Sequence, residues 1–343
     1  MLVVNSSDLM PPDWRFLEPA CDDPEIRWRH VSGRPANMVE RLVRRPSLAR
    51  WRAAARICAV ARERPEESVI VTHLPGMTMA AGLLRRRLCP EVPQIAFSFN
   101  FTTLPGGVRH RMMRDAFAGI TEFVVYSQFE RALYAERFGM DPARFRFLPW
   151  AMEPPVAGPD LPAGMPAAPY LCAIGGEGRD YRSLAEAMRK QPGLHMVVVG
   201  RSYSVAGIDF PANVTVHVDL PAPQTWAVAQ QSLGMAIPLR TAETACGHVT
   251  LVGAQLLGIP LVLSRSVGIS DYVTDGNTAR LVEPGDPAAL AAALAAMVED
   301  RAGSAAMARR GRDAAATRSD PRRWVDYLSE LKGRHAAGTL RPP

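Results

Sequence analysis

A glycine-led turn in the C-terminal half, within GHVTLVGAQLLGIPLVLS at 247–264, has the composition of an anion-binding site. Gly247 permits a tight turn, and the amides of His248, Val249 and Thr250 would open the helix that follows. The first amides of a helix have no partner within it and lie at the positive end of its dipole, so they favour phosphate. The His248 ring and the Thr250 hydroxyl can add donors. The alternative is an ordinary helix start in which the threonine is only a cap.

Glycines and arginines follow other expected strands of the same half. Gly175 and Gly176 would let a ligand approach the backbone closely. Arginines near strand ends are candidates for holding a diphosphate with bidentate hydrogen bonds, and these are Arg179, Arg201 and Arg240. Arg182, the other arginine of this first turn, is better explained as a solvated residue. The expected ligand of this half is therefore a diphosphate.

Acid and base candidates are fewer. Asp8 and His73 each follow an expected strand of the N-terminal half, and either one could accept a proton from a substrate hydroxyl. His73 is the preferred base. Glu243 stands just before the Gly247 turn and is a third catalytic candidate. For each, the alternative role is capping of a turn by a polar side chain.

Alternating strands and helices must position these residues. Strands are expected in the first half at 1–4, 26–31, 68–73, 94–101, 122–127 and 144–150. The segment after 73 is expected to be a turn, with a helix from 77. Strands are expected in the second half at 170–176, 194–201, 214–220, 233–239, 260–264 and 279–285. This alternation predicts two α/β domains, each an open parallel sheet covered by helices, facing each other across a cleft that holds the ligand.

Three segments follow from this pattern. We expect an N-terminal Rossmann-like domain at 1–153 and a C-terminal Rossmann-like domain at 154–318. A terminal helix and tail at 319–343 should pack back toward the N-terminal domain. The stretch 151–170 is rich in Pro, Gly and Ala and is expected to be a linker.

The region 238–290 resembles the donor-binding half of GT-B glycosyltransferases of the group 1, or glycogen-synthase-like, clan. The resemblance rests on the Gly247 turn and helix, the strand after Gly258-Ile259-Pro260, and "DGNTARLVEPGD" at 275–286. It implies the GT-B fold, with the domain 1–153 acceptor-binding and the domain 154–318 nucleotide-sugar-binding. It further implies transfer of a sugar from a nucleoside-diphosphate donor to a hydroxyl of a glycan or of a polyprenyl- or lipid-linked acceptor. It also implies that no cofactor and no metal are required, because arginines and the helix dipole stabilise the leaving diphosphate.

The chain departs from this clan at a pair of donor-site carboxylates spaced Glu-x7-Glu. Ala245 and Gly253 stand at the two positions. Glu243 is a candidate replacement for the first carboxylate, and Gln255 a candidate replacement for the second, on the ribose. The missing pair keeps two alternatives open: a non-catalytic GT-B subunit acting through a partner, and a nucleotide-sugar epimerase of the same architecture.

Composition narrows the setting. The 343 residues are 48% hydrophobic and carry a formal net charge of +6, and no stretch is long and apolar enough to span a bilayer. Five scattered cysteines and the absence of a signal-peptide pattern predict reduced thiols and a cytoplasmic protein.

Two basic segments, 41–56 and 108–117, contain apolar residues among their arginines. They predict contact with an anionic membrane surface, at its inner face, or else ordinary arginine-rich helices. No nucleic-acid-binding motif is present, so we expect no nucleic acid partner.

Overall fold

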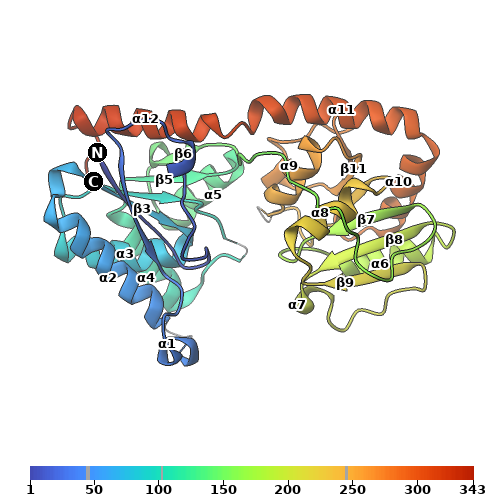
Figure 1. Ribbon diagram of the computed structural model, residues 1–343, viewed down its shortest axis with the longest axis horizontal. Coiled ribbons are helices and arrows are strands. Elements are labelled where there is room, and N and C mark those ends of the chain that lie inside the picture. Colours follow the sequence, from blue (N-terminus) through green and yellow to red (C-terminus); the bar gives the residue numbers. More distant parts are fainter. Residues whose placement is uncertain (44–46, 102, 244–245) are drawn as a thin grey trace. The chain divides into compact units, whose positions relative to one another are not determined.

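The computed structural model describes residues 1–43, 47–101, 103–243 and 246–343. The chain divides into two compact units (Figure 1): unit 1 is Met1–Leu148 with Pro321–Pro343, and unit 2 is Pro149–Asp320. Each unit contains a six-stranded sheet in which all paired strands run parallel. The predicted pair of Rossmann-like domains is confirmed.

Unit 1 has the strand order β2-β1-β3-β4-β5-β6. Its strands are β1 (Leu2–Ser7), β2 (Arg27–Ser32), β3 (Ser68–His73), β4 (Gln94–Phe97), β5 (Glu122–Val125) and β6 (Phe145–Phe147). Its helices are α1 (Met38–Leu42), α2 (Leu48–Glu63), α3 (Leu74–Leu88), α4 (Gly107–Ala118), α5 (Gln128–Phe138) and α12 (Arg322–Ala336).

The two faces of the unit 1 sheet carry different side chains, because successive residues of a strand point to opposite faces. On one face, Val4 and Ile70 join the apolar cluster formed with α2 and α3. The opposite face carries Asn5, His73 and Phe97, and the Phe97 ring packs against Trp324 of α12. Asn5 and His73 thus lie on the face that α12 helps to cover, whereas Ser6, Thr72 and Gln94 lie on the face of Val4 and Ile70.

Unit 2 has the strand order β12-β11-β10-β7-β8-β9. Its strands are β7 (Tyr170–Ile174), β8 (His195–Gly200), β9 (Val214–Val218), β10 (Met235–Ile237), β11 (Leu261–Ser264) and β12 (Arg280–Val282). Its helices are α6 (Tyr181–Arg189), α7 (Ser202–Val205), α8 (Ala222–Gln230), α9 (His248–Leu256), α10 (Pro287–Glu299) and α11 (Arg301–Arg318).

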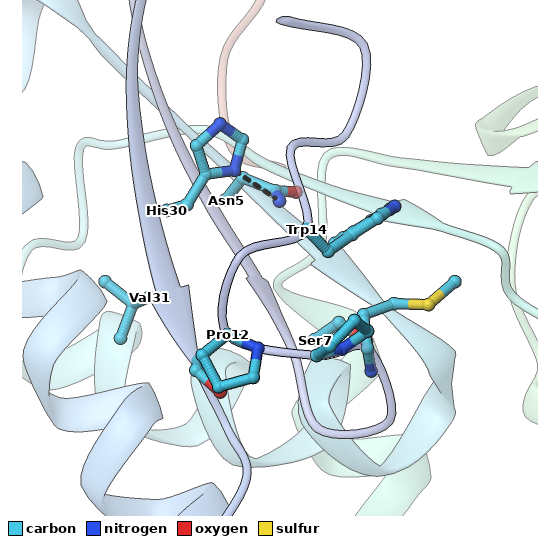
Figure 2. Close-up of a pocket in the computed structure, with 9 residues that line it drawn as sticks. Asn5, Ser7, Pro12, Trp14, His30 and Val31 are labelled. Carbon is cyan, nitrogen blue, oxygen red and sulfur yellow. Dashed lines mark hydrogen bonds between the residues drawn. The ribbon is translucent and has the colours of Figure 1, made fainter.

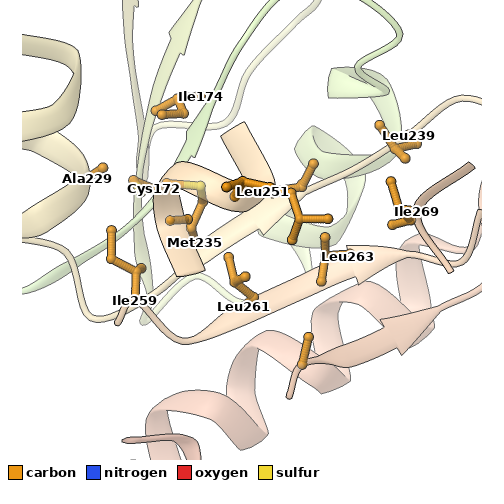
Figure 3. Close-up of a cluster of buried hydrophobic side chains, with 14 of the residues drawn as sticks. Cys172, Ile174, Ala229, Met235, Leu239, Leu251, Ile259, Leu261, Leu263 and Ile269 are labelled. Atoms are coloured by element: carbon orange, nitrogen blue, oxygen red, sulfur yellow. The ribbon is translucent and has the colours of Figure 1, made fainter. Parts of the chain in front are cut away.

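Helix α9 is the buried centre of unit 2. Its residue Leu251 packs with Met235 of β10 and with Leu261 and Leu263 of β11 in one apolar cluster (Figure 3). Seven of its nine residues are buried, which explains why the sequence of this helix is apolar on almost every side. Close packing on this scale fixes the position of the α9 N-terminus relative to the sheet.

One local expectation is wrong, and a second needs an addition. The turn expected after β3 is absent, because α3 begins at Leu74 directly after His73. Leu74 has a φ of 68°, a conformation that is costly for a residue other than glycine. The segment 151–170, expected to be a linker, also packs on unit 2: Gly158 donates to the Pro223 carbonyl, and Leu161 packs against the core.

Candidate functional site

A cavity of about 200 Å³ lies at the carboxyl ends of β7, β8 and β9 in unit 2. Ligands of doubly wound sheets bind at this edge. The cavity is lined by Ile174, Gly175, Val199, Gly200, Arg201, Asp219, Leu220, Ala222, Thr225, Trp226, Val249 and Thr250. It therefore brings together four of the predicted donor-site residues, namely Gly175, Arg201, Val249 and Thr250.

Arg179 lies behind this cavity as a buried cation. Its side chain is 3% exposed. The guanidinium donates to the Ile174 carbonyl at 3.1 Å, to the Glu177 carbonyl at 3.2 Å and to the Thr250 hydroxyl at 2.9 Å. Among the residues that the structure describes, no carboxylate pairs with it. A buried cation without a counter-charge is costly, so this position favours an anionic ligand.

The N-terminus of α9 adds a second source of positive potential at the same place. Gly247 caps the helix with a φ of 98°, which glycine adopts without strain. Within the described ranges, the amides of Val249 and Thr250 have no protein acceptor. Arg179 touches this helix end through Thr250, so two positive groups lie side by side. A helix N-terminus next to an arginine that has no carboxylate partner among the described residues is the arrangement expected for binding phosphate.

Gly175 has to be a glycine because of the position of the Arg179 side chain. Gly175 has a φ of 116°, and a Cβ there would lie 2.7 Å from the guanidinium Nη2. A side chain at this position would therefore displace the Arg179 guanidinium. The neighbouring Gly176 packs against the Arg201 side chain, where a Cβ would lie 2.5 Å from Cγ.

Arg201 and Asp219 form a charged rim on the cavity. Arg201 Nη1 lies 3.3 Å from Asp219 Oδ1. Hydrogen bonds from Ser202, and then from Arg201, hold the pKa of Asp219 below its usual range. Asp219 also has a φ of 53°, and such strained positions gather at ligand sites. Arg201 is compensated, unlike Arg179.

Other predicted donor-site residues lie outside the cavity lining. Arg240 is exposed, and its Nε donates to the Arg179 carbonyl at 3.1 Å. Glu243 is exposed. The predicted roles of Glu243 and Arg240 stay predictions. Ala245, the first of the two departures from the clan, is outside the described residues.

His248 and Gln255 use their side chains inside unit 2. His248 Nε2 lies 2.8 Å from the Gly268 carbonyl, and burial lowers the pKa of this imidazole to about 4. Gln255 donates to the Tyr272 carbonyl at 3.0 Å and accepts from Arg318 at 2.8 Å. The predicted ribose contact of Gln255 thus competes with two internal hydrogen bonds.

Gly253, the second departure, is explained by packing. A Cβ at this position would lie 2.4 Å from Cη2 of Trp226 and 3.0 Å from Cγ of Pro155. The Trp226 ring therefore occupies the space that any side chain at 253 would need. Because Trp226 also lines the cavity, an aromatic ring stands beside the place where the clan has a carboxylate.

In unit 1, a chain of hydrogen bonds crosses five adjacent strands at their carboxyl ends or just beyond. Glu18, from a short 3-10 helix, contacts His30 of β2, and the chain then passes to Asn5 of β1, His73 of β3, Ser98 after β4 and Tyr126 after β5. The distances in that order are 2.9, 3.1, 2.8, 3.3 and 2.6 Å. Figure 2 shows the bond between Asn5 and His30, with Trp14 beside them. A small cavity of about 10 Å³ adjoins this end of the chain.

This chain of hydrogen bonds fixes the tautomer of His73. The Asn5 amide oxygen can only accept, so His73 Nε2 carries the proton and Nδ1 accepts from Ser98. Burial lowers the pKa of His73 to about 3, and its ring packs against Phe16 at 4.5 Å and Trp14 at 4.9 Å. This surrounding makes His73 a neutral hydrogen-bonding group at pH 7 and a weak proton acceptor. Its role as the base stays a prediction.

Asp8, the other candidate base, forms an ion pair. Arg50 Nε of α2 lies 2.6 Å from Asp8 Oδ2, and the carboxylate is largely buried. The arginine therefore competes with any substrate for the oxygens of this carboxylate. The catalytic role of Asp8 also stays a prediction.

The two basic segments differ in what they expose. On α2, the apolar residues Ala54 and Ile57 are buried in the core, so they are not available to a membrane. On α4, Val108 and Met112 are exposed, whereas Met113 is buried. Within the described ranges, no helix has the length and apolar composition needed to cross a membrane.

Comparison with known proteins agrees with the fold. The family model described as "Glycosyl transferases group 1" matches residues 181–300, which run from α6 to the end of α10. Sucrose-phosphate synthase from Thermosynechococcus elongatus matches with a TM-score of 0.74 at 16% identity, over 98% of this chain and 99% of that one. Comparison with curated protein sequences gives no match.

Two further solved structures match over nearly the whole chain. Anabaena HepE in complex with UDP-glucose has a TM-score of 0.73 at 13% identity, covering 97% of this chain and 99% of that one. The lipopolysaccharide outer core galactosyltransferase WaaB has a TM-score of 0.64 at 10% identity, covering 98% and 99%. These likenesses establish the GT-B fold. In addition, residues 181–300 of unit 2 match the model of the group 1 glycosyltransferase family.

Several site residues were not predicted from the sequence. Asn5, Ser98 and Tyr126 are ordinary residues of strands and strand ends, and only the register of the sheet brings them together. Trp226 and Asp219 were not predicted because both lie outside the motif segment 238–290. A signal was present in one case: Gly253 in the middle of a helix implied that something packs closely against it.

Proposed function

We propose that this chain transfers a sugar from a nucleoside-diphosphate sugar to a hydroxyl group of a glycan or a lipid-linked acceptor. The observation that carries the proposal is the buried Arg179, which lies against the N-terminus of α9 and has no carboxylate partner among the described residues. The family match in unit 2 supports the same reaction. The acceptor class is supported by the likeness to WaaB, a lipopolysaccharide outer core galactosyltransferase with the same fold.

The donor diphosphate would bind where Arg179, the α9 amides and the Thr250 hydroxyl meet. The nucleoside would occupy the cavity of about 200 Å³ beside Trp226 and Asp219. UDP is the first nucleotide to test, because HepE has been solved with UDP-glucose. Trp226 would offer an apolar face to the nucleoside in place of the carboxylate that Gly253 cannot provide.

Charge stabilisation of the leaving diphosphate is the main chemical step assigned to unit 2. Breaking the bond between the sugar and the diphosphate builds negative charge on the leaving oxygen, and fixed donors aimed at that oxygen lower the barrier. Arg179 and the α9 amides would supply this charge without a metal ion. The acceptor hydroxyl would be oriented by unit 1, where Asp8 and His73 remain the candidates for receiving its proton.

A paired substitution tests the proposal. UDP affinity is measured by calorimetry for the wild type, Arg179→Gln and Arg182→Gln, with magnesium and with a chelator. Arg182 is exposed on the first turn of α6, so its variant is a matched control for charge. We expect Arg179→Gln to weaken binding by about 1.5–3 kcal/mol, Arg182→Gln to bind as the wild type does, and chelation to change neither. Equal affinity in both variants would contradict the proposed diphosphate site.

The second candidate function is a non-catalytic GT-B subunit. The packing of Trp226 on Gly253 favours it, because this packing removes one carboxylate of the clan's donor site. Release of nucleoside diphosphate from UDP-glucose and other sugar donors separates the two. Slow donor hydrolysis that Arg179→Gln abolishes supports the transferase, whereas donor binding without any release supports the subunit.

A further inference from the structure

Helix α1 presents apolar side chains to solvent. Met38 is 65% exposed, Val39 61% and Leu42 77%. Of the fifteen most exposed large apolar side chains among the described residues, five lie between 38 and 48. Figure 1 shows α1 standing clear of the sheet of unit 1. Large apolar side chains gathered on one projecting element mark an interaction surface.

One buried carboxylate holds α1 in this orientation. Glu40 is largely buried, and its carboxylate accepts from the Ala36 amide and from Arg52 Nε, each at 2.7 Å. The Asn37 side chain caps the helix by accepting from the Glu40 amide at 3.0 Å. Because Glu40 points inward, its neighbours Val39 and Arg41 are exposed. The exposure of the apolar residues is therefore built into the fold.

The exposed surface continues into the loop after β1. Arg52, which holds Glu40, also donates to the Arg34 carbonyl at 2.8 Å. Arg34 in turn donates to the Leu9 carbonyl at 2.6 Å through Nη2. Leu9 is 62% exposed and Met10 38%. We call the residues Leu9, Met10, Met38, Val39 and Leu42 the apolar surface of unit 1.

The surroundings of this surface are strongly basic. Residues 34–56 contain seven arginines and a single carboxylate, Glu40, which is already paired with Arg52. Arg41, on α1 itself, and Arg56 are exposed and have no carboxylate partner among the described residues. Apolar side chains surrounded by arginines match the interface of a bilayer, where the apolar groups enter the lipid and the cations face anionic headgroups.

We propose that the apolar surface of unit 1 docks on an anionic lipid membrane. The occupant is a lipid surface because Arg41 and Arg56 are exposed without a carboxylate partner among the described residues and can face anionic headgroups, and because the apolar side chains stand on a projecting element instead of in a groove. The apolar contact is made by α1 and the loop after β1, since the apolar face of α2 is buried in the core. The surface lies on unit 1 and acts independently of the donor cavity of unit 2.

Co-sedimentation of the full chain with vesicles tests the proposal. One set of vesicles is phosphatidylcholine containing phosphatidylglycerol, and the other is phosphatidylcholine alone. We expect binding to the anionic set only. Leu42→Ser and Leu9→Ser should each lower the partition coefficient by about tenfold. Val156→Ser is the matched control: Val156 is 82% exposed but lies on unit 2, and its variant should bind as the wild type does.

A charge pair completes the design. Arg41→Gln should lower partition by about fivefold, whereas Arg29→Gln, an exposed arginine of β2, should change it much less. The proposal is overturned if Leu42→Ser and Leu9→Ser bind like Val156→Ser, or if the wild type binds neutral vesicles as strongly as anionic ones. UDP affinity is measured on the same samples and should be equal in all of them. Failure of membrane binding is thereby distinguishable from failure of the donor site.

Discussion

The carboxyl edges of the two sheets are built from similar elements but satisfy their charges differently. In unit 2, Arg179 is buried without a carboxylate partner among the described residues, and a cavity of about 200 Å³ opens beside it. In unit 1, Arg50 is paired with Asp8, and His73 is closed into a hydrogen-bond chain under aromatic rings. At the edge of unit 1 Arg50 is paired with Asp8, whereas at the edge of unit 2 Asp219 pairs with Arg201 and Arg179 has no carboxylate partner among the described residues.

This difference indicates which kind of ligand the carboxyl edge of each unit can bind. An uncompensated buried charge is maintained only at a cost, so it points to a ligand that supplies the opposite charge. A satisfied polar chain stabilises its own fold and can hold a neutral hydroxyl by hydrogen bonds, but it offers no strong charge. In the proposed function, the edge of unit 2 would bind the anionic donor and the edge of unit 1 a neutral acceptor.

The largest expected effect comes from restoring a carboxylate on α9. Gly253→Glu forces a side chain against Trp226 and brings a charge into a packed region. We expect a loss of at least about 3 kcal/mol in the free energy of unfolding. Denaturant unfolding measures it. The matched control is Gly333→Glu on α12, where an added Cβ meets nothing within 4 Å and the change should be small.

A second substitution sharpens this result. Trp226→Ala in the Gly253→Glu background removes the ring that blocks the new side chain, so it should recover part of the lost stability. Strict additivity of the two changes, or equal stability of Gly253→Glu and Gly333→Glu, would mean that Trp226 does not explain the missing carboxylate.

The second effect is the pH dependence of stability. Burial lowers the pKa of His248 in unit 2 from 6.5 to about 4 and raises the pKa of Glu130 in unit 1 from 4.5 to about 7. Between these limits the unfolded chain protonates His248 more readily than the folded chain does, so stability falls as pH falls from 6.5 to about 4. For Glu130 the folded chain binds the proton more readily, so its contribution is lost as pH rises from 4.5 to about 7. Each slope is about 1.4 kcal/mol per pH unit.

Calorimetric unfolding between pH 4.5 and 6.5 separates the two groups. His248→Gln should reduce the loss of stability at low pH, and Glu130→Gln should increase it. His73, whose pKa burial lowers to about 3, should act in the same direction as His248 in the other unit. Unchanged slopes in both variants would show that neither side chain has the burial described here.

The fold was largely predictable, because its signals are local and repeated. Buried strands such as SVIVTH and apolar helices such as α9 alternate along the whole chain, and alternation alone predicts parallel sheets. The start of α3 was mispredicted because a Leu-Pro-Gly sequence usually signals a turn. Here Leu74 adopts a positive φ, and the helix begins without one.

The site was less predictable, because its parts come from distant segments. The Gly247 turn and Arg179 could be found from their sequence surroundings. Arg179 Nη2 contacts Thr250, which lies 71 positions further along the sequence. This contact depends on how α9 packs on the sheet. In the same way, the loss of the carboxylate at Gly253 was visible in the sequence, but its cause, Trp226, lies on another helix. Packing of this kind has no local signal in a single sequence.

The smallest expected effect concerns the hydroxyl that joins Arg179 to α9. Thr250→Val removes the acceptor of Arg179 Nη2 while keeping the shape of the side chain, so the guanidinium is held less firmly toward the diphosphate. We expect UDP affinity to fall by about 1 kcal/mol, close to fivefold. Thr225→Val is the matched control, since Thr225 lines the same cavity but directs its hydroxyl to the carbonyls of Leu220 and Pro221. If both variants weaken UDP equally, the cavity needs hydroxyl groups in general. If only Thr250→Val weakens UDP binding, the contrast between the two edges depends on how Arg179 is held. The Thr250 hydroxyl would then be the group that orients this cation for the diphosphate.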